Sequence, residues 1–126
     1  MHPVHILFVA GFGPITKEDH ASKSFYLDIL NLPVKAMEGN ESFMSTNDGE
    51  WGGVKHFAFW PLTQAANSCF WLKEWPEEFN IPQSWIEFEV EDIVVASAYM
   101  VSKGYQLLVN NRIEPWGQSV TRFLSP

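Results

Sequence analysis

Trp85, Glu87 and Glu89 are the residues whose types and spacing most directly suggest a binding site. They alternate with apolar residues, a period of two that is typical of a half-buried strand, so the three side chains share one face. An indole ring beside carboxylates on one face of a sheet suits a cationic or polar aromatic ligand. The structural alternative is that Glu87 and Glu89 pair with Arg112 or Arg122 on neighbouring strands.

Four histidines are candidates for binding a metal ion. His2 and His5 lie near the N-terminus, and His20 falls in the first turn of an expected helix. No pair has His-x-x-x-His or similar spacing on a shared element, so the sequence predicts no metal site. His56 lies on an expected strand, on the same face as Trp60. These two residues form a second candidate for ligand contact, the alternative being that His56 is a structural residue of its strand.

Trp116 is a further aromatic candidate. It follows a proline in an expected loop, where large aromatic side chains often gate pockets. The alternative is that Trp116 anchors this loop in the core. No catalytic residue is assigned, and no cofactor is expected.

A strand–helix–strand unit, Trp85 to Val109, must position the first of these candidates. Residues 85–90 form its first strand, Asp92 caps its helix, and Gly104 takes a left-handed conformation after the last turn. Residues 105–109 are expected to form its second strand. The apolar residues of the first strand are expected to pack under the helix: Ile86, Phe88 and Val90.

The segment from Ile15 to Lys35 resembles a diverged copy of this unit, which indicates one structural unit used twice. With a shift of 73 residues, four positions coincide: Glu18 with Glu91, Asp19 with Asp92, Ser24 with Ser97, and Tyr26 with Tyr99.

Around this first copy the sequence predicts a strand at 4–10, a bend or close backbone approach at Gly11–Pro14, and a helix capped by Thr16. The helix is expected to present one apolar face, made by Ala21, Phe25, Tyr26, Ile29 and Leu30. Three strands follow, at 34–37, 42–46 and 53–60. In the last of them Val54, His56, Ala58 and Trp60 share one face, and Lys55, Phe57 and Phe59 share the other.

Composition narrows the classes of function. The net charge of −7 argues against nucleic acid and anionic membranes as partners, because both require clustered Lys and Arg. A single cysteine allows no internal disulfide, which fits a cytoplasmic protein. The N-terminal segment has neither the basic start of a signal peptide nor the apolar length of a membrane span.

The motifs and their order resemble the vicinal oxygen chelate superfamily, also called the glyoxalase / bleomycin-resistance / dioxygenase superfamily. The resemblance rests on three segments in the expected order: Ser24-Phe25-Tyr26, Phe88 to Asp92, and Glu114-Pro115-Trp116-Gly117 before Arg122-Phe123. It implies an α+β fold of paired βαβββ modules, whose curved mixed sheets form a cleft within one overall domain. The first module would span 1–75, a linker 76–83, and an incomplete βαββ module 84–126 that lacks its last strand. Members of the family usually dimerise, so a homodimer is expected.

The sequence departs from the metal-dependent members of this superfamily at the ligand positions. The resemblance places those positions at Gly11 or Phe12 in the first module and at Ser84 or Trp85 in the second, and none of the four is a good metal ligand. The non-metal branch, whose bleomycin-resistance proteins sequester a drug, therefore fits better. A metal-dependent lyase or dioxygenase is the alternative, and a protein used only for assembly is a third possibility.

Overall fold

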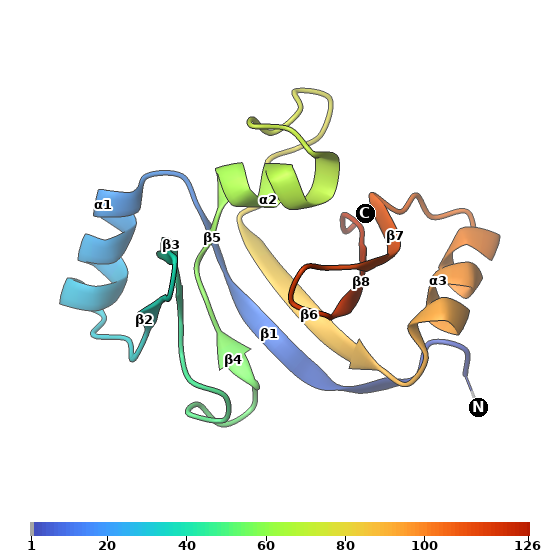
Figure 1. The fold of residues 1–126 in the computed structure, drawn as a ribbon, viewed down its shortest axis with the longest axis horizontal. Helices are drawn as coiled ribbons and strands as arrows, with labels where there is room; N and C mark the ends of the chain where they lie inside the picture. The colour runs from blue at the N-terminus through green and yellow to red at the C-terminus, as the bar shows by residue number, and fades with distance from the viewer. Residues whose placement is uncertain (1) are drawn as a thin grey trace. The chain divides into compact units, whose positions relative to one another are not determined.

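The computed structural model describes residues 2–126, which form an α+β fold with open, curved sheets (Figure 1). The chain divides into a larger compact unit, Val9–Phe88, and a smaller one that combines the residues up to Phe8 with Glu89–Pro126. Two strands run from one unit into the other: β1 (Ile6–Thr16) and β6 (Ser84–Val90). The α+β class is confirmed, whereas the pairing of two βαβββ modules stays a prediction.

β1 is the central strand of the larger unit. β4 (His56–Phe57) and β5 (Trp60–Pro61) pair with it in parallel, and β6 pairs with it as well. A separate antiparallel ribbon is made by β2 (Lys35–Met37) and β3 (Asn40–Ser45). The remaining elements of this unit are α1 (Asp19–Lys23), the π-helix η1 (Ser24–Ile29) and α2 (Leu62–Phe70). Figure 1 shows α1 beside β2 and β3.

β1 is longer than predicted, because it continues through the two glycines to Thr16. A Cβ on Gly13 would overlap the carbonyl oxygen of Ala58, so this glycine marks a close backbone approach rather than a bend. Because α1 begins at Asp19, Thr16 lies too far upstream to cap the helix. Glu18 does so instead, with its carboxylate accepting from the N–H groups of His20 and Ala21.

The predicted apolar face of the first helix is only partly buried. Tyr26 packs against the core, but Ile29 is 71% exposed and Phe25 is half exposed. The reason is the π-helix, in which the N–H of Leu30 bonds to the carbonyl oxygen of Phe25, five residues back. This wider turn changes the direction in which successive side chains point.

The core of the larger unit lies on the α1 side of the sheet. Its buried residues are Val34, Met44, Phe57 and Phe59, with Tyr26, Leu27, Leu32 and Trp51 packed against them. Phe57 and Phe59 therefore share one face, as the alternation predicted. His56 and Trp60 are directed to the opposite face.

The smaller unit is built on α3 (Ile93–Ser102) and the antiparallel hairpin of β7 (Val109–Ile113) and β8 (Ser119–Arg122). The predicted caps are confirmed: Asp92 accepts from two backbone N–H groups at the start of α3, and Gly104 has φ +88°. The strand predicted at 105–109 begins only at Val109. Within residues 2–126, no helix is long and apolar enough to cross a membrane.

Candidate functional site

Three of the residues predicted to contact a ligand, His56, Trp60 and Trp85, lie together in the larger unit. The ring centroids of His56 and Trp85 are 5.9 Å apart. Those of Trp60 and Trp85 are 6.0 Å apart, with the ring planes at 74°. The three side chains come from β4, β5 and β6, which all pair with β1. We call these three residues the aromatic cluster.

Gly11, which lies opposite His56 in the β1–β4 pair, makes room for the aromatic cluster. A Cβ at this position would lie 2.7 Å from Cη2 and Cζ3 of Trp85 and 2.9 Å from Nε2 of His56. Such distances are too short for real contacts, so the two rings pack directly on the backbone of β1 only because Gly11 has no side chain.

Trp85 has a fixed orientation within the cluster. Its indole N–H donates to the carbonyl oxygen of Ala58 over 3.1 Å, which ties the ring to the neighbouring strand segment. All three rings are half-buried, so each keeps some accessible surface for stacking or for a cation–π contact. Glu87 lies two residues after Trp85 on β6, and this spacing puts both side chains on the same face of the strand. Glu87 is also half-buried.

Trp116 belongs to the smaller unit, in the turn between β7 and β8. It is 65% exposed, and its indole N–H donates to Oε1 of Gln118 over 2.9 Å. The alternative in which Trp116 anchors its loop in a core is therefore wrong.

The smaller unit contains a buried ion-pair network that sequence reasoning did not assign. Glu114 is only 7% exposed, and one of its carboxylate oxygens accepts from Arg112 Nη2 at 2.8 Å and from Arg122 Nη1 at 2.7 Å. Burial acts to raise the pKa of Glu114, but the two guanidinium groups outweigh it and the pKa is lowered. One sequence feature could have identified this network: Glu114 stands between two arginines, Arg112 and Arg122, in the β7–β8 hairpin.

The histidines do not gather into a metal centre in the described part of the chain. His5 Nδ1 lies 2.9 Å from Oε2 of Glu91 in the smaller unit, which makes a pair of possible ligands and not a triad. Among residues 2–126, no three His, Cys, Asp or Glu side chains are grouped so that they could hold a metal ion.

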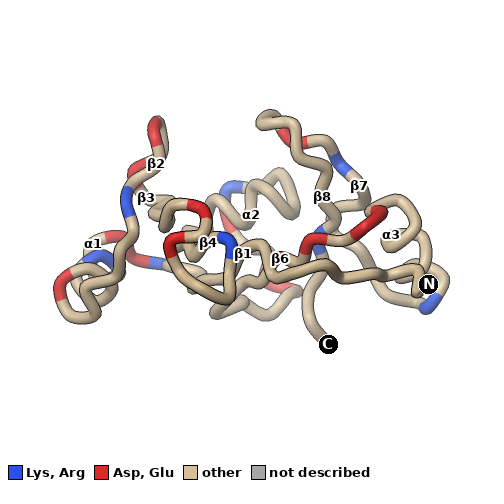
Figure 2. Tube along the Cα trace, turned by 90° about the horizontal axis from the view of Figure 1, so that it is seen from below, with Lys and Arg blue, Asp and Glu red and all other residues tan. Residues whose placement is uncertain are grey.

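Acidic residues outnumber basic ones along the chain, with 15 Asp and Glu against 8 Lys and Arg. Figure 2 shows Lys and Arg interspersed with Asp and Glu along the trace. The expectation that nucleic acid is not a partner stays a prediction based on this balance.

No protein-family model matches the chain, and no curated protein or solved structure matches it at a significant level. The resemblance to the vicinal oxygen chelate superfamily therefore rests on the sequence motifs alone.

Proposed function

We propose that this chain is a small-molecule binding protein of the glyoxalase / bleomycin-resistance type, which holds a flat aromatic or cationic molecule without a catalytic metal. The observation that supports this is the aromatic cluster, where His56, Trp60 and Trp85 meet over Gly11. Partly exposed indole rings offer stacking and cation–π surface, and Glu87 adds negative charge on the same face of β6. Sequestration of an antibiotic in the cytoplasm is one form that this function would take.

The positions that align with metal ligands support a binder over an enzyme. By the resemblance, Gly11 and Trp85 are two of the four residues that stand where metal-dependent members carry a ligand. In this structure the two are in contact, and the space beside Gly11 is filled by the indole ring. Neither residue offers a donor atom for a divalent metal, so the site has the chemistry of an aromatic platform.

Fluorescence titration tests this function, with bleomycin-like glycopeptides and planar cationic dyes as probes. We expect Trp85→Ala to weaken binding by about tenfold, since stacking or cation–π contact on an indole contributes about 0.5–2 kcal/mol. Glu87→Gln should weaken cationic probes more than neutral ones, and that difference should shrink at high salt. Trp71→Ala is the matched control, because Trp71 is exposed after α2 and lies outside the cluster.

Unchanged affinity of a confirmed probe in both Trp85→Ala and Glu87→Gln would exclude the Trp85–Glu87 face. The site would then move to His56 and Trp60, which His56→Ala and Trp60→Ala test in the same titration.

The alternative, a metal-dependent lyase or dioxygenase, is tested by elemental analysis of the dialysed protein. We expect less than stoichiometric zinc, nickel, manganese or iron. One tightly held ion per chain would favour the enzyme.

A further inference from the structure

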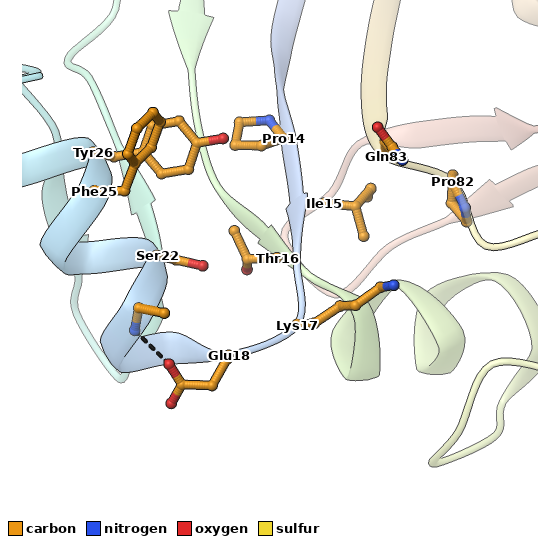
Figure 3. Close-up of a pocket in the computed structure, with 11 residues that line it drawn as sticks. Pro14, Ile15, Thr16, Lys17, Glu18, Ser22, Phe25, Tyr26, Pro82 and Gln83 are labelled. Atoms are coloured by element: carbon orange, nitrogen blue, oxygen red, sulfur yellow. Dashed lines mark hydrogen bonds between the residues drawn. The ribbon is translucent and has the colours of Figure 1, made fainter.

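The larger unit contains a hollow of about 430 Å³ where the end of β1 meets α1 (Figure 3). The hollow is shallow and open to solvent, so a ligand bound there would keep part of its surface exposed. Its lining includes Thr16, Ser22, Lys17, Phe25 and Pro82, and it shares no residue with the aromatic cluster. The hollow is therefore a separate candidate site.

Thr16 gives the hollow a polar end. Thr16 is only 8% exposed. Its hydroxyl nevertheless has no hydrogen-bond partner among residues 2–126. Since no fully enclosed polar side-chain atom of those residues lacks a partner, the Thr16 hydroxyl keeps some accessible surface, and Thr16 lines the hollow. Buried hydroxyls are normally satisfied, so a ligand group is a natural partner here. Figure 3 shows the hydroxyl of Ser22 directed toward Thr16.

Lys17 gives the hollow a charged end. Its side chain is exposed, has no ion-pair partner in the described chain, and extends away from Ser22 toward the side of Pro82 (Figure 3). The neighbouring carboxylate of Glu18 is already engaged, because it accepts from two N–H groups of α1. Lys17 therefore supplies the positive charge that a ligand could pair with at this end of the hollow.

Apolar surface completes the hollow. Ile15 and Pro82 lie on the side toward which Lys17 extends, and Phe25 and Tyr26 lie on the side of Ser22 (Figure 3). Phe25 is half exposed, so an aromatic ring can pack against it.

From this arrangement we propose that the hollow binds a small hydroxylated aromatic carboxylate. The carboxylate pairs with the ammonium of Lys17, the ring packs on the apolar wall, and the ring hydroxyl bonds to Thr16 and Ser22. The proposal is independent of ligand binding at the aromatic cluster.

Nuclear magnetic resonance titration of ¹⁵N-labelled protein tests the proposal with three probes. These are 4-hydroxyphenylacetate, phenylacetate, which lacks the hydroxyl, and 4-hydroxyphenylacetamide, which lacks the charge. We expect saturable shifts of the amides of Thr16, Lys17 and Ser22 with the first probe. Each of the other two should bind about fivefold more weakly, the loss expected for one hydrogen bond or exposed charge pair.

Variants then assign each end of the ligand. Thr16→Val should remove the advantage of the hydroxylated probe over phenylacetate, and Lys17→Gln should remove the advantage of the carboxylate over the amide. The matched controls, Thr63→Val and Lys73→Gln, carry the same changes at exposed positions outside the hollow and should keep both advantages. Ser22→Ala serves as a second test of the hydroxyl end if Thr16→Val does not give a folded spectrum.

Three results would overturn the proposal. One is no saturable shift at these amides up to about 10 mM, ten times the millimolar Kd expected for so small a ligand. Another is that both probe advantages persist in the Thr16 and Lys17 variants. The third is that shifts centre on Gly11, His56 and Trp85 and disappear in Trp85→Ala, which would place the probe on the aromatic cluster instead.

Discussion

Because Gly11 has no side chain, the rings of His56 and Trp85 can pack directly on its backbone. Period-two alternation correctly separated His56 and Trp60 from Phe57 and Phe59, and it identified Trp85 as a candidate for ligand contact. It could not show that Trp85 packs on Gly11, because these residues are far apart in the chain and meet only through strand pairing. His56, Trp60 and Trp85 were each candidates from the sequence, but their meeting over Gly11 was not predictable from it.

Replacing Gly11 by alanine should disturb the aromatic cluster. The new methyl group would meet the Trp85 ring at 2.7 Å, so the indole must shift, and overpacking of this kind costs about 1–3 kcal/mol. We expect a lower free energy of unfolding in urea and altered tryptophan fluorescence.

Gly52→Ala is the matched control, because a Cβ at Gly52 meets nothing within 4 Å. Equal stability of the two variants would show that Trp85 does not pack on Gly11.

At the scale of elements, the sequence placed most helices and strands but not their irregularities. The caps of α3 and the strand β6 were predicted because local signals, an Asp, a Gly and an alternation, determine them. The π-helix η1 and the continuation of β1 to Thr16 were not, because they depend on packing against distant segments rather than on local propensity.

The β7–β8 hairpin should depend on Glu114. Glu114→Gln would remove the buried carboxylate charge from between two partly buried guanidinium groups, which we expect to lower the free energy of unfolding by about 2–4 kcal/mol. Glu91→Gln is the control, because its pair with His5 is largely exposed and should contribute less than about 1 kcal/mol. Equal losses in the two variants would contradict the importance of the buried network.

Acid should weaken the same hairpin. The pKa of Glu114 is lowered in the folded state from the unfolded value of 4.5, so its stabilising effect is present above pH 4.5 and is lost as pH falls through the folded pKa. As the pH falls below 4.5, the wild-type protein should therefore lose more stability than Glu114→Gln. Denaturant titration at a series of pH values measures this difference.

At the scale of the whole molecule, exposed apolar residues favour self-association. Ile86 and Phe88 are 52% and 41% exposed, and the expectation that they pack under a helix stays a prediction. Phe12 on β1 is similarly exposed, and alternation places it, with Ile86 and Phe88, on the face of the sheet opposite the aromatic cluster. Grouped exposed apolar side chains commonly mark an interface.

We therefore expect a homodimer at tens of micromolar protein, as measured by light scattering. Phe88→Lys should shift the protein toward the monomer, because it places a charge on the apolar face. Leu72→Lys, an exposed apolar position in the loop after α2, should leave the dimer intact. A monomeric wild-type protein at this concentration would refute the dimer.

The central position of β1 has a consequence for synthesis. β1 leaves the ribosome before the strands that pair with it, and Gly11 finds its partner only when His56 has been made, 45 residues later. At about 5–20 residues per second this interval is about 2–9 s. During this interval an apolar strand has no partner from its own sheet, so we expect the nascent chain to need protection by chaperones that bind exposed apolar strands.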